Sequence, residues 1–136
     1  MIISRSFEIR TNGHLEITDI TGQIDRLVRT SGLQNGLVNI FIPNNAISIT
    51  TIRCEEGKMG KLPESIQKLG LFGSSSEDSQ LKTALVGCSL TLPIVRSALP
   101  LSIWQQIILI DFGETSQWHQ VIVQMVGEDG KVATTP

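Results

Sequence analysis

Residues 85–112, LVGCSLTLPIVRSALPLSIWQQIILIDF, contain the two segments that decide the fold. We expect strands at Cys88–Val95 and Ile103–Phe112, joined by a short loop that contains Pro100, because β-branched and aliphatic residues dominate both segments. Neither segment runs long enough without polar breaks to be a membrane span. The unbroken apolar run from Ile107 to Ile110 is typical of a strand covered on both faces. We therefore expect that strand at the centre of the core.

Length and composition indicate one domain over residues 1–136, long enough to bury roughly two-thirds of the unfolded surface. The net charge is −2 and the charges are scattered, so no basic face invites nucleic acid. The N-terminal segment MIISRSFEIR alternates polar and apolar residues and lacks the apolar core of a signal peptide. We therefore expect a cytoplasmic protein without a membrane partner. Cys54 and Cys88 could pair in principle, but in a reducing cytoplasm we expect two free, buried thiols.

The N-terminal segment predicts a β-hairpin. Apolar and polar residues alternate through Ile3, Phe7 and Ile9, the period of a half-buried strand. Asn12-Gly13 is the commonest two-residue hairpin turn, and Leu15 and Ile17 continue the apolar face on a return strand.

A helix, a turn and two strands are expected next. Asp19 is placed to cap a helix that Gly32 ends, and the apolar stripe of that helix consists of Ile20, Ile24, Leu27 and Val28. Asn35-Gly36 predicts a turn, and we expect strands at Leu37–Ile42 and Ala46–Ile52.

The second half predicts two more short helices and a last strand. Leu62 and Ile66 are spaced for a helix that starts near Met59 and ends at Gly70. The following segment up to Ser76 is expected to be a solvated loop, with a mobile lid of the same composition as the alternative. A short helix capped by Ser76 or Asp78 would carry Leu81, Ala84 and Leu85 and end at Gly87. A strand is expected over Trp118–Val126, and the tail from Gly127 is expected to fray. These elements predict an α+β domain with a mostly antiparallel, curved or sandwiched sheet and two or three short helices.

Few residues in the chain are typical of a catalytic or metal site. His14 and His119 lie far apart and are both expected at the surface, so we expect no metal site, and nothing indicates a cofactor. Adjacent Glu55 and Glu56 are expected to be solvated. Trp104-Gln105 allows two interpretations: a ring and an amide at a pocket mouth, or a core tryptophan with the amide on the outer face.

Several short motifs in register resemble one known family. They are Gly36-Leu37-Val38 leading to Ile42-Pro43, Leu85-Val86-Gly87 with Ser89-Leu90-Thr91-Leu92-Pro93, Trp104-Gln105, and Val126-Gly127-Glu128. Together they resemble the YjbQ family in order and spacing, from the first helix to Glu128. The resemblance implies a small α+β fold, a secondary thiamine-phosphate synthase activity, and a homo-oligomer, in particular a trimer.

At the positions where the family carries its polar site residues, this chain departs from the pattern. Asn44-Asn45-Ala46 stands where the family has His-Thr-Thr, and Ile52-Arg53 where it has Asn-Glu. Ser76 and Gln80 replace the Asn and His of an Asn-x-x-x-His motif. The arginines usual near the start of the last strand correspond to His119-Gln120 or their neighbours. Ser89, Trp104 and Gln105 retain the pattern.

Amides and arginine cannot replace imidazole and carboxylate in proton transfer near neutral pH. We therefore expect a non-catalytic or repurposed member of the family that binds a small anionic or phosphorylated ligand or acts through oligomer assembly. The alternative is a weak thiamine-phosphate synthase, so whether the protein is an enzyme stays open. The ligand-binding candidates are Asn44, Asn45, Arg53, Gln80, Ser89, Trp104 and Gln105.

Overall fold

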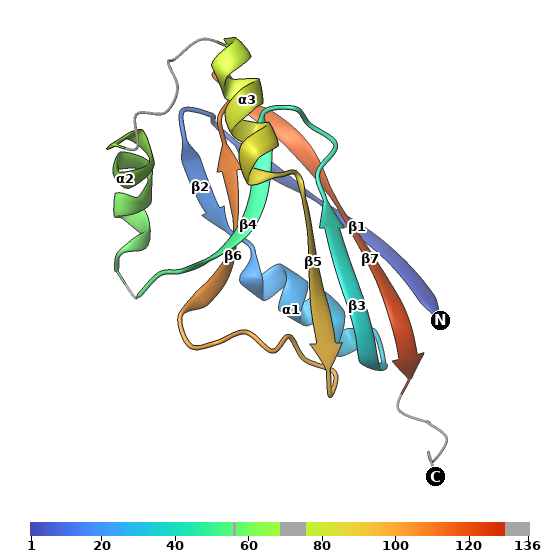
Figure 1. Cartoon of the computed structure of the whole chain (residues 1–136). Helices are drawn as coiled ribbons and strands as arrows, with labels where there is room; N and C mark the ends of the chain where they lie inside the picture. Colours follow the sequence, from blue (N-terminus) through green and yellow to red (C-terminus); the bar gives the residue numbers. More distant parts are fainter. Residues whose placement is uncertain (56, 69–75, 130–136) are drawn as a thin grey trace.

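The structure is a computed structural model that describes residues 1–55, 57–68 and 76–129 (Figure 1). Within these ranges seven strands and three α-helices follow one another along the chain. They are β1 Ile2–Thr11, β2 Glu16–Asp19, α1 Thr21–Thr30, β3 Leu33–Phe41, β4 Ile47–Arg53, the 3-10 turn η1 Met59–Lys61, α2 Leu62–Lys68, α3 Ser76–Val86, β5 Ser89–Val95, β6 Gln105–Asp111 and β7 Gln117–Asp129.

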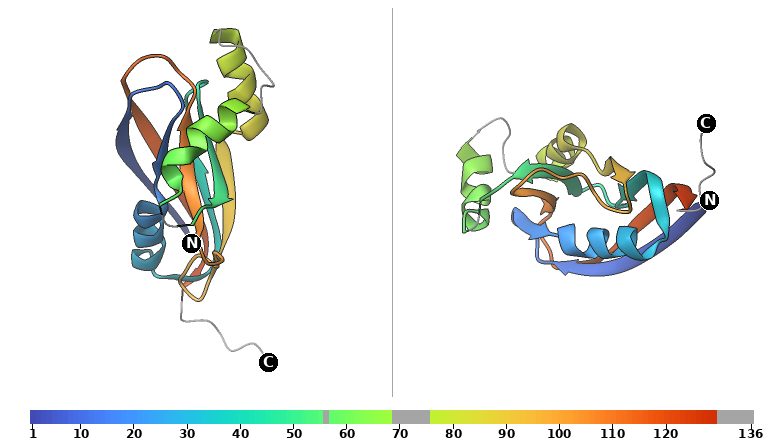
Figure 2. Two further views of the ribbon diagram at one scale, coloured as in Figure 1. Left: turned by 90° about the vertical axis from the view of Figure 1, so that its left-hand side faces the viewer. Right: turned by 90° about the horizontal axis from the view of Figure 1, so that it is seen from below.

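The described strands form two antiparallel sheets that face each other (Figure 2). One sheet has the order β1-β7-β3-β5, and the other has the order β2-β6-β4. Each strand belongs to the sheet opposite its predecessor, so in the described ranges no two consecutive strands pair with each other. The predicted α+β class with a sandwiched, mostly antiparallel sheet is confirmed.

The hairpin predicted around Asn12-Gly13 is wrong. The chain does reverse there, with positive φ at Gly13, His14 and Leu15, but it crosses from one sheet to the other. β1 pairs with β7, whereas β2 pairs with β6. The reason is packing: the apolar residues of β1 enter the core between the sheets, and Ile17 joins a second cluster that includes α2 residues.

β6 is the central strand of the smaller sheet and is buried on both faces, as its apolar run predicted. Ile107 and Leu109 point into the core between the sheets. Ile108 and Ile110 belong to the second cluster, against which Leu62 of α2 packs. The segments predicted at 88–95 and 103–112 are therefore both strands, but β5 and β6 lie in different sheets.

Helix α1 forms as its stripe predicted. Ile24 and Val28 are fully buried in the core between the sheets. The N-cap residue is Ile20 and not Asp19, so the expected cap is wrong in its position, but Asp19 Oδ1 accepts a hydrogen bond from the Thr21 backbone N–H at 2.9 Å and satisfies one of the free donors at the helix start. Gly32 has a φ of +82°, the left-handed conformation that stops a helix.

Gly36 and Gly127 lie opposite each other inside two paired strands, and neither of them ends a strand. The turn predicted at Asn35-Gly36 is wrong, because Gly36 lies inside β3 and pairs with Gly127 of β7. A side chain on Gly36 would collide with the Val126 carbonyl oxygen, and one on Gly127 with that of Asn35, so the close approach requires glycine at both. The tail expected to fray from Gly127 instead continues β7 to Asp129, and residues 130–136 lie outside the described residues.

Helices α2 and α3 occupy the places that the sequence predicted. The end expected at Gly70, the loop up to residue 75 and the side chains of the expected caps lie outside the described residues. In α3, Leu81 and Leu85 are exposed, whereas Thr83 is buried. The backbone carbonyl of Thr83 accepts a hydrogen bond from Ser48 Oγ of β4.

The two cysteines are free thiols, as expected, but only Cys54 is buried. Cys88 is half-buried, so its expected burial is wrong. Among the described residues, no helix is long and apolar enough to cross a bilayer.

Candidate functional site

Two hollows lie near opposite ends of β4. The first, here called the polar hollow, has a volume of about 220 Å³ and is lined by Asn44, Asn45, Ala46, Asp111, Gly113, Glu114, Thr115, Gln117 and His119. The second, here called the basic hollow, has a volume of about 360 Å³ and is lined by Arg53, Cys54, Glu55, Lys58, Lys61, Leu62 and Ser65.

The polar hollow lies where three connections cross between the sheets, β1 to β2, β3 to β4 and β6 to β7. These connections lie together at one end of the sandwich (Figure 1). Thr11 ends β1, Asn44 lies between β3 and β4, Asp111 ends β6, and His119 lies near the start of β7. Residues up to 108 positions apart are thereby brought into contact.

A chain of hydrogen bonds connects these four side chains. Asp111, His119 and Thr11 are nearly inaccessible, at 2%, 5% and 1% exposed. Thr11 Oγ1 donates to Asp111 Oδ2 at 2.6 Å, and His119 Nε2 lies 2.8 Å from Thr11 Oγ1. Asn44 Nδ2 lies 3.2 Å from His119 Nδ1. Asn44, the last member of this series of hydrogen bonds, also lines the hollow.

The donors and acceptors fix the direction of this chain. The hydroxyl hydrogen of Thr11 goes to Asp111, so the Thr11 oxygen accepts the hydrogen on Nε2 of His119. The Ala46 backbone N–H donates to Asn44 Oδ1 at 2.8 Å, which turns the amide NH₂ of Asn44 toward Nδ1 of the ring. His119 is therefore the neutral tautomer with its hydrogen on Nε2, and both ring nitrogens are used within the protein.

The polar hollow carries negative charge. Asp111 Oδ1 accepts the Gly113 backbone N–H at 2.8 Å, so both oxygens of this buried carboxylate bond to neutral donors. Glu114 adds a second, exposed carboxylate to the lining. No lysine or arginine of the described chain lines this hollow.

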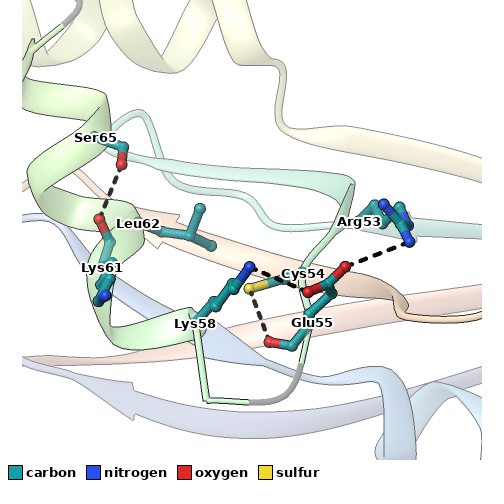
Figure 3. Close-up of a pocket in the computed structure, with 7 residues that line it drawn as sticks. All are labelled: Arg53, Cys54, Glu55, Lys58, Lys61, Leu62 and Ser65. Carbon is teal, nitrogen blue, oxygen red and sulfur yellow. Dashed lines mark hydrogen bonds and ion pairs between the residues drawn. The ribbon is translucent and has the colours of Figure 1, made fainter.

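The basic hollow lies between the end of β4 and helix α2 (Figure 3). Glu55 is held between two cations, with Oε1 3.5 Å from Arg53 Nη2 and Oε2 3.1 Å from Lys58 Nζ. Lys61 adds a third cationic side chain to the lining from η1. The lining side chains in the described ranges therefore sum to a formal charge of +2.

Local side-chain contacts position the other lining residues of the basic hollow. Ser65 Oγ donates to the Lys61 carbonyl oxygen at 3.1 Å within the helical segment. Leu62 packs against the apolar cluster under α2 and anchors that wall of the hollow. The Cys54 thiol is buried and contacts the Glu55 carbonyl oxygen at 3.8 Å.

The structure divides the predicted ligand-binding residues between separate places. Asn44 and Asn45 line the polar hollow, whereas Arg53 lines the basic hollow. Gln105 is the β6 partner of Arg53 in the sheet, and the Trp104 carbonyl oxygen accepts the Cys54 N–H at 2.8 Å. The backbone of Trp104-Gln105 therefore lies beside the basic hollow, although neither residue lines it.

Neither interpretation of Trp104-Gln105 fits fully. The ring of Trp104 is 38% exposed and so is no core tryptophan. Gln105 uses its amide internally: Oε1 accepts from the Ser102 N–H at 3.0 Å, and Nε2 donates to Thr51 Oγ1 at 3.2 Å. Its amide holds the β5–β6 loop on β4.

Ser89 and Gln80 belong to neither hollow. Ser89 is exposed on β5, where its hydroxyl accepts a hydrogen bond from Asn39 Nδ2 at 2.9 Å. Gln80 is exposed on α3.

The expectation that His119 lies at the surface is wrong, whereas His14 is exposed as expected. The signal was in the sequence, because His119 continues the alternation of Val121, Val123 and Met125, all of which point into the core. Thr11 and Asp111 carried no comparable signal. Within the described residues, no group of three or more His, Cys, Asp or Glu is placed to hold a metal ion.

Comparison with known proteins identifies the family. The model of the family described as UPF0047 protein YjbQ-like matches residues 5–128. A UPF0047 protein of Archaeoglobus fulgidus is 30% identical over 124 residues, which cover 85% of this chain and 95% of that protein. The chain therefore belongs to the YjbQ family.

Solved structures show the same fold. A YbjQ-like protein of unknown function from Sulfolobus solfataricus superposes with a TM-score of 0.78 at 22% identity, covering 94% of this chain and all of that one. A hypothetical protein from Aeropyrum pernix also gives a TM-score of 0.78, at 24% identity, and covers 93% of this chain and 99% of that one.

Proposed function

We propose that this protein is a repurposed, non-catalytic member of the YjbQ family that binds a small anionic, phosphorylated molecule in the basic hollow. The observation that carries this proposal is the set of cationic side chains, Arg53, Lys58 and Lys61, around one hollow of about 360 Å³. A guanidinium offers a planar pair of N–H donors to a phosphate, and the two ammonium groups add charge from flexible stems.

Glu55 supports the same proposal, because its carboxylate already occupies a position between two of these cations. The Arg53 side chain is 65% exposed and that of Glu55 is 44% exposed. Exposed ion pairs contribute only about 0–1 kcal/mol, so a phosphate with more negative charge displaces the carboxylate at little cost.

Isothermal titration with inorganic pyrophosphate and with thiamine phosphate tests the proposal. We expect Arg53→Ala to weaken binding about threefold to fivefold, and Glu55→Gln to strengthen it by a similar factor, because the competing carboxylate is removed. Arg26→Ala, which removes an exposed arginine from α1, is the matched control and should leave binding unchanged. Failure of the wild-type protein to bind either compound would refute this function.

The non-catalytic part of the proposal rests on His119. A general base needs a free nitrogen within reach of its substrate, and both nitrogens of this ring are hydrogen-bonded inside the protein. Asn44 contacts Nδ1 of the ring and is itself held by the Ala46 N–H.

A weak thiamine-phosphate synthase is the second candidate function, and the buried Asp111 and His119 beside one hollow favour it. Purified protein can be assayed for thiamine phosphate formation from the pyrimidine and thiazole phosphates. A rate above background that Asp111→Asn abolishes would support an enzyme that works in the polar hollow. A rate that Gln105→Ala abolishes would place the reaction at the basic end instead.

Assembly is a further part of the proposal. The outer face of the larger sheet exposes a row of apolar side chains, and the family resemblance implies a homo-oligomer, in particular a trimer. This row contains Ile2, Leu37 and Val126, which lie side by side on β1, β3 and β7. Light scattering should give the mass of an oligomer at micromolar concentration, and a monomer would contradict the assembly.

A further inference from the structure

The polar hollow has a chemistry opposite to that of the basic hollow. Its carboxylates belong to Asp111, which is buried at the end of β6, and to Glu114, which lies at the exposed rim. A buried carboxylate is usually paired with a cation, because desolvation costs far more than neutral hydrogen bonds return.

Asp111 has no such cation within the described chain. Its hydrogen-bond donors are the Thr11 hydroxyl and the Gly113 backbone N–H, both neutral. The nearest basic side chain is His119, with Nε2 3.9 Å from Asp111 Oδ2. The amide of Asn44 turns its NH₂ group toward the other ring nitrogen, so the ring is held in its neutral form.

The lining offers acceptors to match a cation. Asn45, Thr115 and Gln117 add amide and hydroxyl oxygens around the two carboxylates. At about 30 Å³ for each water, a hollow of 220 Å³ has room for about seven waters, and hence for a ligand of about seven non-hydrogen atoms. A transition-metal ion such as zinc does not match this set, because the described residues place no three His, Cys, Asp or Glu side chains around one point.

We infer that the polar hollow binds a small organic cation with N–H donors, a primary ammonium or an amidinium group, between Asp111 and Glu114. The ligand supplies the positive charge that the protein withholds from Asp111. The neutral chain from Asn44 to Asp111 then fixes the orientation of the carboxylate that receives it. This site is separate from the basic hollow, so its occupancy does not depend on the proposed phosphate site.

Titration of the ¹⁵N-labelled protein with ethanolamine, followed by NMR, tests the site. We expect saturable shifts of the backbone amides of Gly113 and Thr115 and of the Asn44 side-chain amide. Tetramethylammonium has the same charge but no N–H donor, and it should bind at least about threefold more weakly. Mg²⁺ should cause no saturable shift of the same signals.

Two variants test whether the carboxylate charges, and not merely an intact fold, are needed for ethanolamine binding. Asp111→Asn should weaken ethanolamine binding about tenfold, and Glu114→Gln about twofold to fivefold, because the second carboxylate is exposed. Glu114 makes the test robust, since its exposed side chain can change without disturbing the buried chain. Glu128→Gln, at the far end of β7, is the matched control and should change nothing.

Three results would overturn the inference. They are the absence of saturable shifts up to about 100 mM ethanolamine, a site that Mg²⁺ fills and amines do not, and ethanolamine binding that Glu114→Gln leaves unchanged. Binding of pyrophosphate at the basic hollow is measured separately, so either site can fail without the other.

Discussion

The sites at the two ends of β4 differ in burial: the polar end is buried, and the basic end is exposed. At the polar end, Thr11, Asp111 and His119 are almost fully buried and joined by hydrogen bonds of fixed direction. At the basic end, Arg53 and Glu55 remain largely in water and form a loose ion pair. The buried hydrogen bonds of the first site help to hold the fold together, whereas the ion pair of the second site lies on the surface and contributes little to stability. Mutations in the buried hydrogen-bonded residues of the polar end should therefore reduce stability, whereas mutations of the charged residues at the basic end should change ligand binding with little effect on stability.

The largest expected effect comes from Thr11→Val, which keeps the shape of the side chain and removes the hydroxyl. The change leaves both Asp111 Oδ2 and the Nε2–H of His119 without a partner in a buried place. We expect a loss of about 3 kcal/mol in the free energy of unfolding, measured by urea denaturation. Thr91→Val, at an exposed threonine on the outer face of β5, should cost less than about 0.5 kcal/mol. Equal costs for the two variants would contradict the description of the polar end.

Asn44→Ala should have an intermediate effect. It removes the hydrogen bond to Nδ1 of His119 and the acceptor of the Ala46 N–H, so we expect a loss of about 1–2 kcal/mol in the same measurement. The neighbouring Asn45→Ala removes an exposed amide and is the matched control, with an expected change below about 0.5 kcal/mol.

The ring of His119 gives a direct reading of the same contact. In the wild-type protein, long-range ¹H–¹⁵N spectra should show hydrogen on Nε2 alone, because Nδ1 accepts from the Asn44 amide. Hydrogen on Nδ1 of the wild-type ring would mean that the chain runs in another direction and would remove the argument against a catalytic histidine.

The smallest effect on stability is expected at the basic end. Glu55→Gln breaks exposed ion pairs with Arg53 and Lys58, which contribute little in water, so the free energy of unfolding should change by less than about 0.5 kcal/mol. The same variant should bind pyrophosphate more tightly, and raising the salt concentration should reduce that gain through screening. A large loss of stability would show that this end is as structural as the other.

Local pattern predicted the elements of this fold well. The stripe on α1, the run at 107–110 of β6 and the alternation of β7 each led to the element that forms there, because burial of a helix stripe or strand face is a local periodicity. The pairing of strands was not local. Asn12-Gly13 and Asn35-Gly36 have the composition of turns, yet the first crosses between sheets and the second lies inside β3.

The site divided along the same line. Arg53, Lys58 and Lys61 lie within one short segment, but only Arg53 was predicted as a ligand contact, and the two lysines were not singled out. The partners of the polar end come from β1, β6, β7 and the connection between β3 and β4. Of these partners only Asn44 was predicted, and His119 was expected at the surface.

The sequence by itself determined where most helices and strands form, much of the apolar core and the family, because each of these depends on side chains that are close along the chain. Only the tertiary structure decided that consecutive strands alternate between two sheets. That alternation brings three crossing connections to one end and joins Thr11 to Asp111 and His119. Hydrogen-bond partners about 100 residues apart are chosen by the packing of the two sheets, a property of the whole molecule that no local pattern encodes.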